Sequence, residues 1–282
     1  MSRRLVSVRA TGKAEGNQSF LKGITDLLVV AGLFSAWYGC NIYFNIFNKQ
    51  VLSVFPQPLT CTWIHLLISS LMALLLWTFR LKKAPVVTPR IIDIIFPLAL
   101  LHLMGFYTTN ASLGKVAVSL THTIKSMEPF FTVVLSWLLM GTRPAKRVIF
   151  ALTPVVAGVV VASATDLSFN WAGFNAAMLS NVAFQMRNVL SKKAMSRASF
   201  DSLEGGDTAD LDEVNIFALM SIGACILMAP LLLLDAPAAL ANPGGPTLWM
   251  SQDVLAKTVA AGVCRYDFST SAGRPRADIP WL

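Results

Sequence analysis

Long apolar runs with almost no charged residues dominate this sequence. A run of about 18 such residues is long enough for a helix to cross the ~30 Å hydrocarbon core of a bilayer. Seven runs meet this length and lie near 27–48, 59–79, 91–112, 117–140, 148–165, 171–191 and 215–235. Only 13% of the residues are charged, against roughly 25% in an ordinary soluble domain. The sequence therefore predicts an all-α, multi-pass transmembrane helical bundle and excludes a soluble globular enzyme.

The basic residues indicate how these runs cross the membrane, because Lys and Arg accumulate in short loops on one side. If successive runs alternate in direction, 15 of the 23 Lys and Arg residues fall on the side of the N-terminus. Only Lys49, Lys115 and Lys257 fall on the other side. One miscounted span would abolish this alternation. The charges thus support the count of seven and place the N-terminus on the positive side.

Two polar segments accompany the apolar runs. Residues 1–26 contain five basic residues, three serines and a single acid before Asp26. This composition is typical of the end of an organellar transit peptide and equally of a positive-side anchor, and both readings stay open. Residues 198–214 contain six acids and two glycines without apolar periodicity. We interpret them as a solvated linker, because they do not fit the register of an EF-hand calcium loop.

The C-terminal end departs from the pattern of complete spans. An eighth apolar run begins near Leu255 and stops at Arg265, and about ten apolar residues cannot cross a bilayer. Either this helix ends at the membrane interface, or the sequence is a truncated or misread form of a longer chain. We expect an incomplete transmembrane domain over 27–264 and a separate tail over 265–282.

The densest group of polar residues inside a span lies in the fourth run. In a continuous helix Thr121, Lys125 and Glu128 share one face, and His122 lies three residues before Lys125. Pro129 has no N–H and should loosen the helix at this turn. Lys125 and Glu128 either neutralise each other and stabilise the bundle, or they belong to an anion site. In the second case Lys125 is the ammonium group that binds phosphate.

One lysine does not balance a phosphate, which carries about −1.5 to −2 charges at pH 7. Further cationic groups must then come from other helices. Arg187 in the sixth run is a candidate, with Asn181, Gln185 and Asn188 nearby. It also lies close enough to Lys192 to snorkel toward the positive side, and we favour that interpretation.

Several classes of function have no support in the sequence. It contains no GxSxG, HExxH or GxxxxGK[ST] motif, so the residues that hydrolase, metalloprotease and ATPase chemistry require are missing. The four cysteines have neither CxxC nor Cys/His spacing, so no zinc site is indicated. Basic residues form no patch interleaved with aromatic residues, which argues against nucleic-acid binding. We expect no enzyme activity, no cofactor and no metal.

Three segments resemble the plastid phosphate translocators of the drug/metabolite transporter superfamily. They are NIYFNIFNKQVL at 41–52, TTNASLGKVAVSLTHTIKSMEPFF at 108–131 and SFNWAGF…RNVLSKKAM at 168–195. The resemblance runs from about residue 33 to about residue 235 and is nearest to the phosphoenolpyruvate/phosphate translocators. It implies ten helices in two inverted five-helix repeats, of which this chain carries seven and the start of an eighth.

The resemblance also implies roles for particular residues. Lys125 would bind phosphate, and Thr109 would donate a hydrogen bond to it. Phe106 stands in the pocket where the triose-phosphate group has a histidine and the phosphoenolpyruvate group usually an asparagine. The family's other phosphate ligands, a tyrosine in the eighth helix and a Lys-Arg pair in the ninth, have no counterpart before Arg265.

The expected function follows from this resemblance. It is the exchange of an organic phosphate, phosphoenolpyruvate or a similar three-carbon phosphate, for inorganic phosphate by alternating access across the inner plastid envelope. The alternatives are a truncated form that does not transport, and a nucleotide-sugar or sugar-phosphate antiporter of the Golgi or endoplasmic reticulum. The expected partners are these small phosphates and the lipid bilayer, with association into homo-oligomers left open.

Overall fold

The computed structural model describes residues 2–54, 56–203, 212–241, 256, 257 and 259. Over these residues the chain forms eight helices and no strand, which confirms the predicted all-α fold class. The helices are α1 (Ser2–Val54), α2 (Pro58–Thr78), α3 (Pro89–Lys115), α4 (Val118–Lys125), α5 (Glu128–Met140), α6 (Lys146–Thr165), α7 (Trp171–Leu203) and α8 (Glu213–Ala241). The predicted tail over 265–282 and most of the eighth apolar run lie outside the described residues.

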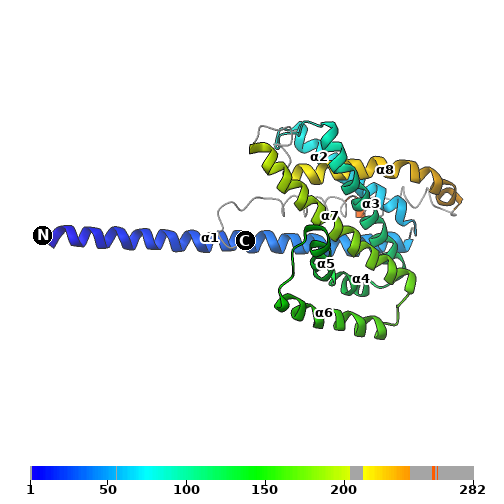
Figure 1. Ribbon diagram of the computed structural model, residues 1–282, viewed down its shortest axis with the longest axis horizontal. Helices are drawn as coiled ribbons and strands as arrows, with labels where there is room; N and C mark the ends of the chain where they lie inside the picture. The colour runs from blue at the N-terminus through cyan, green and yellow to red at the C-terminus, as the bar shows by residue number, and fades with distance from the viewer. Residues whose placement is uncertain (1, 55, 204–211, 242–255, 258, 260–282) are drawn as a thin grey trace.

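Helix α1 is much longer than the first apolar run. It begins at Ser2 and projects from the bundle that the other helices form (Figure 1). The basic segment predicted over residues 1–26 is therefore helical from Ser2 onward. Its backbone continues directly into the first run.

Five of the described helices are long and apolar enough to cross a membrane, namely α1 from Leu27 onward, α2, α3, α6 and α8. They correspond to the first, second, third, fifth and seventh predicted runs. The sixth run forms α7, whose 33 residues include several buried polar side chains. The fourth run differs more, because it is divided into the short helices α4 and α5.

The division between α4 and α5 has a local cause. Pro129 lies in the first turn of α5, where its missing N–H costs nothing, but it cannot continue a helix that comes from α4. Helix α4 accordingly ends at Lys125, and α5 starts at Glu128. Lys125 and Glu128 thus lie on either side of a helix break instead of on one continuous face.

The acidic segment over 198–214 is not a linker throughout. Helix α7 continues through its first residues to Leu203. At its other end the carboxylate of Asp212 accepts a hydrogen bond from the backbone N–H of Asn215 at 2.9 Å, as an N-terminal cap of α8. Asp212 also forms an ion pair with Lys82 in the loop after α2. Both ends of the segment are thus part of, or cap, a helix, and residues 204–211 between them lie outside the described residues.

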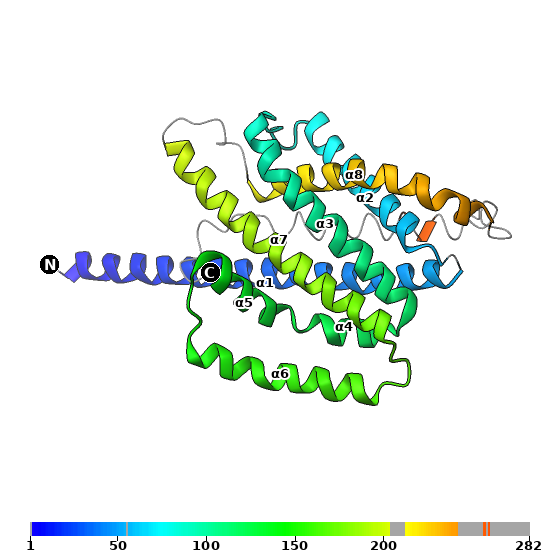
Figure 2. The same ribbon diagram turned by 45° about the vertical axis from the view of Figure 1, so that its right-hand side comes forward.

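Helix α3 lies at the centre of the bundle and packs against α7, α8 and α2 (Figures 1 and 2). Leu98 of α3 and Met220 of α8 share one buried cluster, and Leu66 of α2 and Met228 of α8 share another. Helix α6 instead lies at the edge of the bundle, and the side chain of Phe150 is 82% exposed. Such an apolar outer surface fits contact with lipid.

A chain of buried polar side chains joins three helices. Asn48 of α1 donates a hydrogen bond to the side-chain oxygen of Asn110 of α3 at 2.8 Å, and Asn110 donates to the hydroxyl of Thr62 of α2 at 2.6 Å. Asn45 donates to Asn41 within α1. Of these α1 asparagines, Asn48 therefore provides a bond between helices, which stabilises the packing of α1, α2 and α3.

We expect Asn110→Ala to lower the free energy of unfolding by about 1–3 kcal/mol, because it removes two bonds between helices and leaves Asn48 and Thr62 with buried groups to satisfy. The melting temperature of the detergent-solubilised protein measures this. Thr153→Val is the control, because the Thr153 hydroxyl is exposed and bonds to Ile149 in its own helix. Equal melting temperatures for the two variants would contradict the prediction.

Candidate functional site

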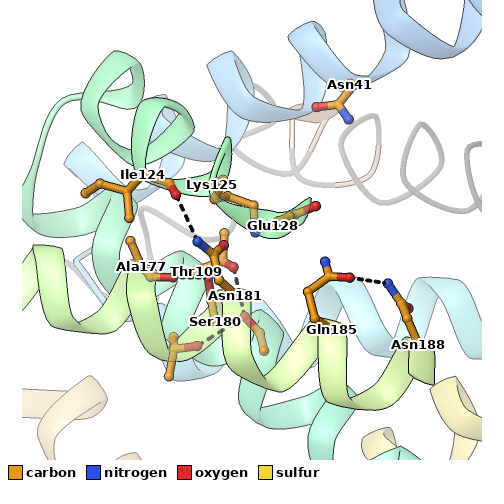
Figure 3. A network of polar contacts seen from close by, with 12 residues as sticks. Asn41, Thr109, Ile124, Lys125, Glu128, Ala177, Ser180, Asn181, Gln185 and Asn188 are labelled. Atoms are coloured by element: carbon orange, nitrogen blue, oxygen red, sulfur yellow. Dashed lines mark hydrogen bonds and ion pairs between the residues drawn. The ribbon is translucent and has the colours of Figure 1, made fainter. Parts of the chain in front are cut away.

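The site is built around the break between α4 and α5. At the end of α4 the backbone turns tightly, with the N–H of Met127 donating to the carbonyl of Ile124 at 3.1 Å. The side chain of Asn181 on α7 donates to the same carbonyl at 2.9 Å (Figure 3). A polar side chain of a neighbouring helix thus stabilises a break that would otherwise expose backbone groups inside the bundle.

Lys125 is the last residue of α4, and its ammonium group is turned into this region. Its Nζ lies 3.3 Å from Oε1 of Glu128 across the break (Figure 3). The same Nζ lies 4.7 Å from the centre of the Phe184 ring of α7. A lysine over an aromatic face and beside one carboxylate keeps its charge inside the bundle at a lower cost than a lysine facing hydrocarbon.

Arg187 of α7 faces the same aromatic ring. Its Cζ lies 5.0 Å from the centre of the Phe184 ring, one helical turn away on the same helix. Its Nη1 lies 2.8 Å from Nδ1 of His102 on α3, and its Nη2 donates to Asn188 at 2.7 Å. These partners lie within the bundle, so the snorkelling predicted for Arg187 is wrong. Two cationic groups from different helices, Lys125 and Arg187, meet at one ring.

Phe106 and Thr109 line α3 on the side of α7. The Phe106 ring makes edge-to-face contacts with Phe184 at 4.8 Å and with His102 at 4.5 Å between ring centres. It therefore adds an apolar wall beside the two cations. Thr109 lies almost one turn further along α3 and is buried, and its hydroxyl donates to the carbonyl of Gly105 at 2.8 Å.

The structure does not bring the two remaining predicted residues to the ring of Phe184. Thr121 is fully buried, and its hydroxyl lies 3.1 Å from that of Ser112 at the end of α3. It thereby links α4 to α3, one turn before Lys125. His122 is on an exposed face of α4. Both are adjacent to Lys125 in sequence, but neither shares its aromatic contact.

Sequence reasoning missed Phe184, and it missed the hydrogen bond that His102 makes. Phe184 is one of 17 phenylalanines, and its spacing of three residues from Arg187 was the only signal that could have marked it. Packing is the default expectation for His102, a solitary histidine in the third apolar run, and the structure shows it both packed and hydrogen-bonded to Arg187. Gln185, beside Phe184, accepts a hydrogen bond from Thr132 of α5 at 2.7 Å and so ties α5 to α7.

The close approach of α3 to α7 at this point requires a glycine. A Cβ at Gly105 would lie 2.7 Å from the ring of Phe184, whereas a Cβ at Gly158 of α6 would meet nothing within 4 Å. We expect Gly105→Ala to displace the Phe184 ring and destabilise the protein by about 1–3 kcal/mol. Gly158→Ala is the matched control, expected to leave the melting temperature unchanged or slightly raised. Identical melting temperatures for both variants would show that Phe184 is not held as described.

A broken helix with buried charged side chains in the interior of a helical membrane bundle is typical of secondary transporters. The fold therefore defines the class as an all-α, multi-pass membrane protein, with two cationic side chains inside its helical bundle. The sequence profile of the Triose-phosphate Transporter family matches residues 28–273, and the chain belongs to this family. The match extends past residue 235, where the motif resemblance was predicted to end.

The curated relatives are plastid translocators. The chain is 46% identical over 233 residues to phosphoenolpyruvate/phosphate translocator 1, chloroplastic, of Oryza sativa subsp. japonica, covering 82% of this chain and 55% of that protein. It is 42% identical over 271 residues to translocator 2 of that type from Arabidopsis thaliana, covering 94% and 68%. The triose phosphate/phosphate translocator of Pisum sativum is 38% identical over 214 residues, covering 76% and 50%. The chain thus matches about half to two thirds of the length of these relatives.

Proposed function

We propose that this chain binds phosphate at Lys125 and Arg187 and serves the exchange of an organic phosphate for inorganic phosphate across the inner plastid envelope. The observation that carries the proposal is the meeting of these two cations from α4 and α7 at the Phe184 ring. Two positive charges match the roughly −1.5 to −2 charges of phosphate, and Glu128 offsets part of that charge when the site is empty.

The hydroxyl of Thr109 is the proposed neutral donor. It now donates within α3 to the carbonyl of Gly105, and a rotation about one side-chain bond would redirect it. Thr121 and His122 stay outside the proposed set, because Thr121 is engaged with Ser112 and His122 is exposed. Alternating access would use the break between α4 and α5 as the point where Lys125 changes its position.

Phe106 supports phosphoenolpyruvate as the organic substrate. Its ring faces the site between His102 and Phe184 and offers no hydrogen-bond partner to a hydroxyl group. Phosphoenolpyruvate carries no hydroxyl group on its carbon chain, whereas a triose phosphate carries at least one. A ring at this position leaves the hydroxyl group of a triose phosphate without a partner, and the carboxylate of phosphoenolpyruvate must be bound by other groups of the site. The names of relatives from Oryza and Arabidopsis agree with this preference and with a plastid location.

We expect Phe106→His to shift the preference toward triose phosphates. Uptake of labelled phosphate into liposomes that contain the chain and trapped phosphate would be measured in competition with external phosphoenolpyruvate or dihydroxyacetone phosphate. Uptake by the unmodified chain should be inhibited more strongly by phosphoenolpyruvate than by dihydroxyacetone phosphate. In the variant, the ratio of the two inhibition constants should change about tenfold toward dihydroxyacetone phosphate. Phe96→His, at an exposed position of α3, is the control. Unchanged preference in Phe106→His would remove Phe106 from the substrate pocket.

A further inference from the structure

We propose that His102 is a positioning residue that holds the guanidinium group of Arg187 inside the site. The inference rests on the proposed function, because it concerns how Arg187 is kept available for phosphate. Arg187 has an alternative place for its side chain toward the positive side, where Lys192 lies further along the same helix. The contact between Nη1 of Arg187 and Nδ1 of His102, at 2.8 Å, opposes that alternative.

The chemistry of the two groups fixes the state of the imidazole. A guanidinium group has five N–H donors and no acceptor, so Nδ1 of His102 must accept the hydrogen bond. His102 is therefore neutral and carries its proton on Nε2. A doubly protonated imidazole would place an N–H donor and a second positive charge against Arg187.

Packing fixes the orientation of the imidazole. His102 is 1% exposed and stands between two aromatic rings, with ring-centre distances of 4.5 Å to Phe106 and 5.4 Å to Phe217. Both contacts are close to perpendicular, at 89° and 81°. The acceptor atom is consequently held in one direction, and the guanidinium group that bonds to it is held with it.

Further contacts of Arg187 come from its own helix. Asn188 accepts from Nε at 3.2 Å and from Nη2 at 2.7 Å, and Phe184 lies beneath Cζ. These partners move with α7 and do not decide the position of Arg187 relative to α3. Within the part of the chain that the structure describes, the hydrogen bond to His102 joins the guanidinium group to α3. His102 thus sets the position of Arg187 relative to Phe106.

The test compares two substitutions of similar shape in the 282-residue chain. His102→Leu removes the acceptor, and His102→Asn keeps an oxygen that can take the place of Nδ1. Binding of labelled inorganic phosphate to the purified protein in detergent should weaken about tenfold in His102→Leu and recover most of its affinity in His102→Asn. In an Arg187→Gln background, His102→Leu should cause no further loss, because the two residues act through one bond.

The outcomes separate the two proposals. If the unmodified chain does not bind phosphate, the proposed function is wrong and this inference falls with it. If the unmodified chain binds phosphate and His102→Leu binds it equally well, or weakens binding equally with and without Arg187, His102 does not position Arg187 and only this inference is overturned.

A second measurement reads the state of the imidazole in the unmodified protein, and a variant is needed only to assign the signal. The chain has three histidines, and nitrogen NMR of histidine-labelled protein distinguishes a protonated from an accepting ring nitrogen. His102, assigned by the signal that disappears in His102→Asn, should carry its proton on Nε2 with an accepting Nδ1. A proton on Nδ1 would overturn the inference.

Discussion

Lys125→Met is expected to reduce phosphate exchange roughly 100-fold, because it removes one of two charges that bind the anion inside the bundle. The loss should appear as weaker phosphate binding as well as slower exchange. Lys125 lies 3.3 Å from Glu128 and 4.7 Å from the Phe184 ring, so its removal leaves Arg187 as the cation at that ring. The measurement is uptake of labelled phosphate by liposomes that contain trapped phosphate.

Two controls separate this effect from a loss of folding. Lys115→Met removes a charge from an exposed side chain at the end of α3 and should leave exchange unchanged. Lys125→Met combined with Glu128→Gln removes both members of the ion pair, so no carboxylate is left without its partner. The double variant should regain the melting temperature of the unmodified protein without regaining exchange. Normal exchange in Lys125→Met would exclude Lys125 from the site.

Arg187→Gln is expected to reduce phosphate affinity about 30-fold, somewhat less than the loss of Lys125. The smaller effect follows from the bonds of Arg187 to His102 and Asn188, which already use part of its donor capacity. Glutamine keeps a polar group beside both partners but removes the charge. The affinity is measured as the concentration of phosphate that gives half-maximal exchange.

Lys192→Gln is the matched control for Arg187→Gln. Lys192 lies on the same helix, is exposed, and belongs to the basic residues of the positive side. We expect its loss to leave phosphate affinity unchanged. If Lys192→Gln and Arg187→Gln weaken phosphate binding equally, the effect comes from the general positive potential of α7, and the specific role of Arg187 is refuted.

The sequence was sufficient to predict the helical class and most of the membrane helices, because hydrocarbon requires long apolar helices and few other structures. The ends of α2, α3 and α6 agree with the apolar runs to within a few residues. The division of the fourth run was only partly predictable. Pro129 indicated a loosened turn, but the stabilising bond from Asn181 to the carbonyl of Ile124 depends on how α7 packs against α4.

The residues of the site also differ in whether the sequence alone or only the packing of the helices reveals their roles. Lys125 was predicted because a charge in an apolar run is conspicuous. The inward position of the Arg187 side chain was not predicted, because its distance from Lys192 along the helix allowed snorkelling. Only the packing of α3 against α7 places Nδ1 of His102 at 2.8 Å from Nη1 of Arg187. Phe184 carries no charge and has no distinctive motif, so its role depends entirely on which side chains the bundle places against it.

Counter-exchange of phosphate tests the central proposal most directly. Liposomes containing the 282-residue chain would be supplied with labelled external phosphate, with and without phosphate or phosphoenolpyruvate trapped inside. We predict saturable uptake that requires a trapped counter-substrate and that falls roughly 100-fold in Lys125→Met. Uptake that is absent, or equal with and without a trapped counter-substrate, would contradict the proposal that Lys125 and Arg187 form the site of a phosphate exchanger.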